Sequence, residues 1–195
     1  MDTNDALRLD LPLHIDAGPL RLQVPQAGDG AALCEAITES LTDLRRFLSA
    51  LPWVAAEPSP AASEAWCRRS HANFLARTDL PFLMHEAATG RLLGACGLHR
   101  PDWQVPKLEI GYWCRSGAQG RGWVGRAVIA LTEYAFTHAQ AVRVELVTDT
   151  ENTPSRRVAE RCGFTLEGVR RHALRNPAGQ LRSLCDYARL RDDAA

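Results

Sequence analysis

The chain has 195 residues, with 23 basic and 23 acidic side chains, a formal net charge of zero and 46% hydrophobic residues. This length is typical of one domain that buries roughly 70% of its unfolded surface, so a sizeable core is expected. A zero net charge produces no global field that would attract nucleic acid or an anionic membrane. We therefore expect neither of these as a partner.

The cysteines and histidines show no metal-site or disulfide pattern. Six cysteines are widely spaced without a C-x-x-C pair, and six histidines show neither H-x-x-x-H nor H-E-x-x-H spacing. The first ten residues, MDTNDALRLD, lack an apolar signal core, and no uncharged apolar run approaches the roughly 20 residues that span a bilayer. These features predict a reduced, cytoplasmic protein without a metal.

Hydrophobic periodicity predicts a mixed sheet with helices. Residues 1–15 are expected to be loosely ordered, and residues 16–191 to form a single domain. The expected elements, in chain order, are a strand at 20–24, helices at about 29–41 and 42–51, a loop at 52–63, a helix at 63–77, strands at 81–86, 92–99 and 108–115, a helix at 123–139, a strand at 142–148, a helix at 154–162, and a hairpin of 169–174 with 183–190. Early helices, antiparallel strands and one strand–loop–helix–strand unit indicate an α/β (α+β) fold with helices on both faces of the sheet.

A glycine-rich loop, AQGRGWVGRA at residues 118–127, precedes one of the expected helices. Its glycines allow a tight turn and close approach of the backbone to a ligand. The amides and positive dipole end of the following helix favour a phosphate. Gly120, Gly122 and Gly125 fit G-x-G-x-x-G, which is typical of dinucleotide binding, whereas Gln119 with the first two glycines fits Q-G-x-G, which is typical of coenzyme A binding.

The dinucleotide interpretation has support and three weaknesses. Glu145 lies 20 residues past Gly125, where an acid that binds the ribose is expected. However, the loop begins more than 110 residues into the chain, and only about one further β–α unit follows it. The preceding strand also carries Glu109, whereas strands of parallel sheets tend to be continuously apolar.

Four segments carry a resemblance to a known family. They are EIGYW at 109–113, QGRGW at 119–123, NTPS at 152–155 and RCGFTLEG at 161–168. With them the chain resembles the GNAT N-acetyltransferases, and more narrowly the RimJ/RimL-like branch, which acetylates protein N-terminal amines. The resemblance implies a mostly antiparallel sheet of six to seven strands, acetyl-CoA as the cofactor and an amine-bearing acceptor.

The resemblance also implies two catalytic residues. Glu109 is the candidate base for the amine, because about 17 Å of strand separates it from Cys114, a span along which an extended pantetheine arm can lie. The alternative for Glu109 is a salt bridge with an arginine. Ser155 is the candidate acid toward the leaving thiolate, and its alternative is a helix-start residue, since Ser and Asn are favoured there.

The cofactor-binding residues implied by the resemblance lie on the strand, the glycine loop and the next helix start. They are Trp113, Cys114, Gln119, Gly120, Arg121, Gly122, Trp123, Val124 and Asn152. A backbone N–H near Trp113 or Cys114 is the expected oxyanion donor, freed from the sheet by a β-bulge. Nothing near Cys114 in sequence would activate its thiol, so direct attack in a ternary complex is favoured over an acyl-enzyme.

The leading hypothesis is therefore an acetyl-CoA-dependent N-acetyltransferase whose acceptor is a protein N-terminal amine, as in a ribosomal protein. Three alternatives stay open: a small-molecule amine acyltransferase, a non-catalytic acyl-CoA-binding module, and a nicotinamide-dependent oxidoreductase. The sequence leaves open the acceptor, the acyl group and the oligomeric state, and is compatible with a homodimer.

Overall fold

A computed structural model describes residues 3–193 of the chain. Its helices and strands are, in order, α1 (Thr3–Ala6), β1 (His14–Ala17), β2 (Leu20–Gln23), α2 (Gly30–Leu48), α3 (Pro52–Ala55), α4 (Pro60–Leu75), β3 (Leu80–Glu86), β4 (Leu92–Asp102), β5 (Lys107–Cys114), α5 (Trp123–Thr137), β6 (Arg143–Asp149), α6 (Thr153–Arg161), β7 (Thr165–Arg175) and β8 (Leu181–Leu190).

The strands form one mixed sheet in the order β1-β2-β3-β4-β5-β6-β8-β7. Only the pair β5–β6 is parallel, and all other neighbours run antiparallel. The expected mixed, mostly antiparallel sheet is confirmed, with eight strands rather than six or seven because β1 was not expected. A dinucleotide-binding sheet needs successive parallel strands, so the single parallel pair overturns that interpretation of the glycine loop.

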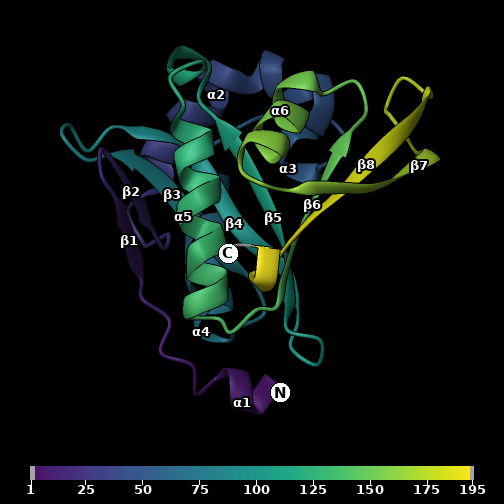
Figure 1. The fold of residues 1–195 in the computed structure, drawn as a ribbon. Coiled ribbons are helices and arrows are strands. Elements are labelled where there is room, and N and C mark those ends of the chain that lie inside the picture. The colour runs from purple at the N-terminus through teal and green to yellow at the C-terminus, as the bar shows by residue number, and fades with distance from the viewer. Residues whose placement is uncertain (1–2, 194–195) are drawn as a thin grey trace.

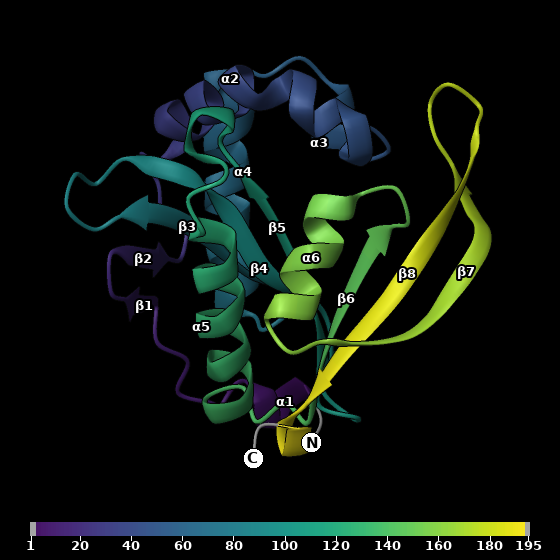
Figure 2. The same ribbon diagram turned by 45° about the horizontal axis from the view of Figure 1, so that its top comes forward.

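Helices cover both faces of this sheet (Figure 1). Side chains alternate between the faces along each strand, so Leu98 of β4 joins the core beneath α5, whereas Ala95 joins a second core beneath α2. Helices α5 and α6 lie on one face, and α2, α3 and α4 lie on the other (Figures 1 and 2). The predicted placement of helices on both faces is therefore confirmed.

Two helix boundaries differ from the sequence expectation. Residues 30–48 form one helix instead of two, because no proline or glycine interrupts the buried stripe that runs from Leu33 to Leu44. The stretch expected as a loop contains α3 and the start of α4. Pro60 occupies the first turn of α4, where its missing N–H costs nothing, and the Ser59 side chain accepts a hydrogen bond from the Ala62 amide at 3.2 Å.

The N-terminal segment, expected to be loosely ordered, contributes α1 and β1 among its described residues. Ala6 and Leu11 are buried in the main core, and the Tyr134 hydroxyl donates a hydrogen bond to the Pro12 carbonyl at 3.1 Å. These contacts join residues that are far apart in sequence. No local periodicity in the N-terminal segment therefore predicts them.

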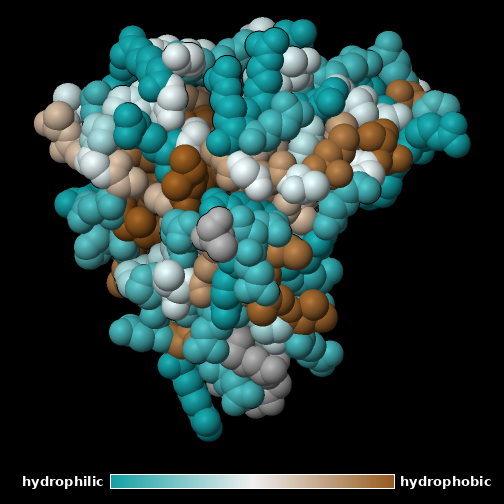
Figure 3. All heavy atoms as spheres, viewed as in Figure 1, coloured by the Kyte–Doolittle hydropathy of each residue, from teal (hydrophilic) through white to brown (hydrophobic). Residues whose placement is uncertain are grey.

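The β7–β8 hairpin projects from the sheet as an arm (Figure 2). Apolar side chains gather over this arm on the face shown in Figure 3, and Val169 and Leu181 are exposed on it. None of the described helices is long and apolar enough to cross a membrane.

Gly94 sets the close approach of β4 to β5 and gives the first prediction. A Cβ at this position would lie 2.2 Å from the Trp113 carbonyl oxygen, and Gly94 has a φ of +148°. Gly94→Ala should therefore lower the free energy of unfolding by at least about 2 kcal/mol, measured by urea denaturation. Gly168→Ala is the matched control, because nothing lies within 4 Å of its added Cβ. Equal stability of the two variants would contradict this account of the strand contact.

Candidate active site

Strands β5 and β6 separate soon after they begin, and this opens the sheet. They pair in parallel only from Lys107 to Glu109, opposite Arg143 to Glu145, and beyond that point β6 pairs with β8 alone. The two strands diverge in Figure 2, with α6 in front of the gap. Parallel pairing therefore ends just where the sequence places its candidate carboxylate.

The divergence leaves backbone amides of β5 without a strand partner on one side. Successive amides along a strand point alternately toward and away from the antiparallel neighbour. Arg115 N–H donates to the Leu93 carbonyl at 2.7 Å, so the amide of Trp113 also points toward β4. The amides of Tyr112 and Cys114 then point toward the opened side.

The expected β-bulge near Trp113 is not the cause of this opening. The register between β4 and β5 is regular from Glu109 to Cys114, and the shift in this pair lies between His99 and Asp102. This corrects the sequence-based expectation. The donors are freed because β6 stays paired with β8 while its pairing with β5 ends, so no extra residue in β5 is needed.

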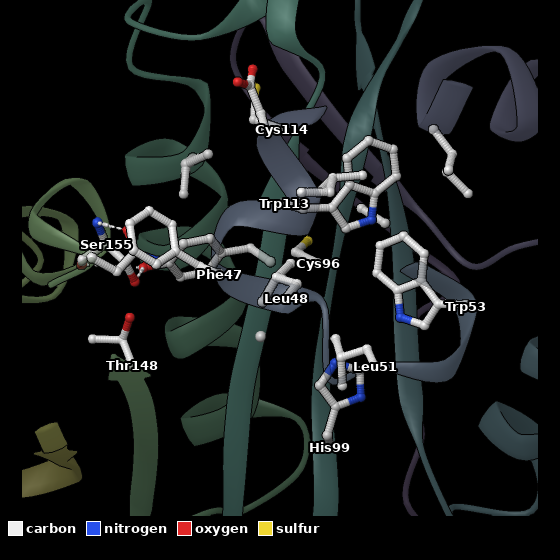
Figure 4. A pocket seen from close by; sticks show the side chains of 18 of the residues that line it. Phe47, Leu48, Leu51, Trp53, Cys96, His99, Trp113, Cys114, Thr148 and Ser155 are labelled. Carbon is white, nitrogen blue, oxygen red and sulfur yellow. Dashed lines mark hydrogen bonds between the residues drawn. The ribbon is translucent and has the colours of Figure 1, made fainter. Parts of the chain in front are cut away.

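A cleft of about 1430 Å³ follows the divergence and continues to the other face of the sheet. Pockets for a single small ligand usually measure about 300–1000 Å³, so this cleft is large enough for two molecules side by side. Its walls come from the glycine loop, β5, the start of α6 and the α2–α3 segment. Figure 4 places Ser155 and Thr148 on one side of this space and Trp53, Leu51 and His99 on the other.

The glycine loop reaches the cleft with its backbone. Gly120 and Gly122 have φ of +74° and +79°, and a Cβ at either position would meet nothing within 4 Å. Gly122 caps the N-terminus of α5, whose first-turn amides have no partner within the helix. Gln119, Trp123 and Val124 also line the cleft. This arrangement can hold an anion such as a diphosphate.

Arg121 behaves differently from the rest of the predicted phosphate loop. Its side chain is exposed, and it is absent from the described cleft lining. Gln119 instead braces the loop, because its Nε2 lies 3.4 Å from both Asp43 Oδ2 and the Cys114 carbonyl oxygen.

A charge network centred on the buried Arg115, which sequence reasoning missed, joins the loop to α2. The Arg115 side chain is only 8% exposed; its Nε donates to Glu39 Oε2 at 2.5 Å, and its Nη2 to Glu35. Glu39 also accepts from the Gly117 amide at 3.0 Å. The hydrogen bonds from Arg115 and then Gly117 lower the pKa of Glu39, so this carboxylate stays charged.

Glu109 lies in the cleft and is ion-paired with Arg100. The Arg100 Nε donates to Glu109 Oε2 at 2.9 Å, and its Nη2 donates to Oε1. Arg100 adopts a φ of +49°, which is unusual for a residue with a side chain. The salt bridge that was the alternative for Glu109 is therefore present, and it coexists with the cleft position that a catalytic role requires.

Ser155 and Asn152 meet at the first turn of α6. Asn152 is the N-cap, and its Oδ1 accepts from the Ser155 amide at 3.3 Å. The Ser155 hydroxyl lies 2.9 Å from the Tyr112 hydroxyl. Burial raises the pKa of Tyr112 to about 12, so this phenol stays protonated. Tyr112 packs against the main core, and its contact with Ser155 joins β5 to α6 across the cleft.

Cys114 also lines the cleft, at the end of β5. Burial raises the pKa of its thiol to about 11, so the reactive thiolate is scarce at neutral pH. Among the described residues, no group of three or more His, Cys, Asp or Glu side chains is placed to hold a metal ion.

The opposite part of the cleft is apolar and aromatic. The rings of Trp53 and Trp113 pack with centroids 6.0 Å apart, and Trp53 comes from α3 while Trp113 comes from β5. Phe47, Leu48 and Trp66 extend this wall. Such a surface can receive a second molecule from the face opposite the glycine loop.

Comparisons with known proteins agree with this geometry. The family model described as an acetyltransferase (GNAT) domain matches residues 20–165. A relative from Bacillus subtilis, which bears the provisional name ribosomal N-acetyltransferase YdaF, is 39% identical over 85 residues, or 44% of this chain and 46% of the relative. The chain thus matches less than half the length of this curated relative.

Two solved structures share the fold. RimL, a ribosomal-protein α-N-acetyltransferase solved with coenzyme A, superposes with a TM-score of 0.84 at 20% identity, covering 92% of this chain and 99% of RimL. MccE, a microcin self-immunity acetyltransferase solved with acetyl-CoA and AMP, superposes with a TM-score of 0.83 at 23% identity, covering 92% and 97% of the two chains.

Proposed function

Because this chain belongs to the GNAT family of acetyltransferases, we propose that it transfers an acetyl group from acetyl-CoA to a primary amine. The observation that carries the proposal is the single cleft shared by the glycine loop, the opened edge of β5 and the aromatic wall. The first two parts fit a long, flexible cofactor with a diphosphate, and the third fits an acceptor. A protein that only binds acetyl-CoA would not require the aromatic wall as a second binding surface beside β5.

The glycine loop fits the cofactor on one direct observation. The space beside Gly120 and Gly122 is open where a Cβ would stand, so a diphosphate can approach the amides at the start of α5. The opened amides of Tyr112 and Cys114 would then donate to an extended pantetheine arm along β5. When bound, acetyl-CoA supplies the acetyl thioester and a thiolate leaving group.

The residues of the cleft divide the proton transfers between two sides. Glu109 takes the proton of the acceptor amine, directly or through a water molecule. The backbone amide of Tyr112 or of Cys114 can donate a hydrogen bond to the acetyl carbonyl oxygen as negative charge develops there. Ser155, hydrogen-bonded to Tyr112, gives a proton to the sulfur. The raised pKa of Cys114 supports direct transfer to the amine over an acyl-enzyme.

We propose a protein N-terminal α-amine as the acceptor. Its pKa is about 8, against about 10.4 for a lysine side chain, so it is neutral far more often and a carboxylate suffices as the base. The provisional name of the Bacillus subtilis relative, ribosomal N-acetyltransferase, supports a ribosomal protein as the acceptor. A small-molecule amine is the second candidate, favoured by the likeness to MccE, which was solved with AMP.

The experiment that tests this function is a mass-spectrometric screen of acceptors. Acetyl-CoA is incubated with the enzyme and with peptides that have a free N-terminus, N-blocked peptides that contain lysine, and small amines. We expect acetylation of the free N-termini alone. Products only from small amines would select the second candidate, and no product from any amine would leave a binding module.

Gly122 gives a prediction on cofactor affinity. Gly122→Ala should raise the Kd for coenzyme A roughly tenfold, because the added Cβ occupies the phosphate approach and strains the cap. Gly179→Ala is the matched control, since Gly179 has a φ of +80° and equally open surroundings but lies in the β7–β8 turn and is not among the described lining residues of the cleft. Calorimetry that gave equal Kd values for both variants would argue against phosphate binding at this loop.

Glu109 gives a prediction on turnover. Glu109→Gln should lower kcat by roughly 100-fold while the Kd for acetyl-CoA stays the same, because only proton removal is lost. Glu145→Gln serves as the control, since Glu145 is the β6 partner of Glu109 and is paired with Arg143 at 2.8 Å. Steady-state kinetics with an unchanged kcat for Glu109→Gln would remove it from this role.

Ser155 gives a prediction on the leaving group. Ser155→Ala should slow transfer roughly tenfold, and Tyr112→Phe should reproduce part of this loss, because the phenol orients the serine hydroxyl. Ser183→Ala, on β8 and outside the described cleft lining, should retain the full rate. A Ser155→Ala enzyme with the wild-type kcat would leave Ser155 as a helix-start residue only.

A further inference from the structure

We infer that His99, supported by Asp79, is the residue that finally receives the proton leaving the acceptor amine. This inference rests on the proposed acetyl transfer and extends it by a second catalytic pair. His99 lies on β4 and Asp79 lies just before β3, and both line the cleft. Figure 4 shows His99 on the same side of the cleft as Trp53.

The hydrogen bond between the two residues assigns the protons of the imidazole. Nδ1 of His99 lies 2.7 Å from Asp79 Oδ1. A carboxylate only accepts hydrogen bonds, so Nδ1 carries a hydrogen and the neutral ring has its lone pair on Nε2. No described residue makes a hydrogen bond with Nε2. The ring therefore presents an unoccupied base to the cleft.

Two glycines show that Nε2 of His99 lies further along β4 and β5 than the His99 backbone does. A Cβ at Gly97 would lie 2.9 Å from His99 Nε2, and a Cβ at Gly111 would lie 3.1 Å from it. Gly97 and Gly111 are partners in the β4–β5 register, one step on the same face from the pair His99–Glu109. The imidazole thus lies over the glycine pair, in space that any other residue would fill, and reaches toward the end of β5 where the amides open.

Glu109 and His99 complement each other as proton acceptors. They are direct cross-strand partners, so their Cβ atoms are separated by about 5 Å on one face of the sheet. Both oxygens of Glu109 already accept hydrogen bonds from Arg100. Nε2 of His99 accepts from no described residue, and Asp79 holds the ring in place through Nδ1.

The proton balance of the reaction is then complete. The acceptor ammonium loses one proton through Glu109 and water to His99 Nε2, and His99 later releases it to solvent. The nitrogen forms its bond to the acetyl carbon as the carbon–sulfur bond breaks. The nitrogen releases its second proton to solvent as the amide forms, Ser155 donates its proton to sulfur, and Ser155 takes a proton back from solvent, so that one proton is released for each turnover.

Imidazole rescue tests this role. His99→Ala should lower kcat roughly 30-fold with an unchanged Kd for acetyl-CoA, and added imidazole should restore a substantial part of the rate by occupying the space above the glycines. Asp79→Asn should lower kcat less. His85→Ala is the matched control: His85 lies on β3, its Nδ1 is 3.3 Å from the Gly90 carbonyl oxygen, and it should show neither a loss nor a response to imidazole.

The outcomes separate this inference from the proposed function. A wild-type enzyme that acetylates no amine overturns both. A wild-type enzyme that is active, with His99→Ala equally active or slowed without any response to imidazole, overturns the role of His99 alone. Should His99→Ala fail to fold, His99→Gln keeps the polar contact to Asp79 but lacks the base. It must show the same fall in kcat, and a normal kcat for it contradicts the inference.

Discussion

The early end of the β5–β6 pairing is the constraint on which the site depends. Three residues of β5 pair with β6, and the strand then continues beside β4 alone. A backbone donor without a partner is costly inside a protein, so the opened amides of Tyr112 and Cys114 are stable only where water or a ligand reaches them. The same divergence makes room for the start of α6, which brings Ser155 to the Tyr112 hydroxyl.

Polar contacts to α2 hold the glycine loop against this opening. Arg115 is buried between two glutamates, and the Ser116 amide donates to the Ser40 hydroxyl at 3.0 Å. Arg115 therefore contacts two side chains of α2, and the Gly117 amide adds a third link through Glu39, so several hydrogen bonds favour one loop position. Helix α2 packs on the same face of the sheet as the aromatic wall, and these contacts therefore link the position of the glycine loop to that of the wall.

The sequence was sufficient for features that depend on local patterns. Gly120 and Gly122 form the tight turn before a helix, Asn152 caps α6 and Glu109 lies on β5 in the cleft, all of which local patterns predicted; their functional roles stay predictions. The features that it missed depend on contacts between distant segments. Arg115 meets Glu35 and Glu39 across about 80 residues, and no periodic signal marks such a pair.

The same reason explains why His99 was not recognised. A single histidine on a strand resembles any core or surface residue, and Asp79 is 20 residues away along the chain. Gly97 and Gly111 carried the only signal, since two glycines within strands often mark a close approach by another group. Only the strand register shows that Gly97 and Gly111 lie opposite each other and together leave space for the His99 ring.

Residue-resolved amide hydrogen exchange with and without acetyl-CoA tests the central claim most directly. If the cofactor lies along the opened edge of β5, exchange at Tyr112 and Cys114 must slow on binding, while Trp113, already bonded toward β4, changes little. Slowing at the glycine loop without any change at Tyr112 and Cys114 would contradict the account, because the cofactor would then be held away from the strand.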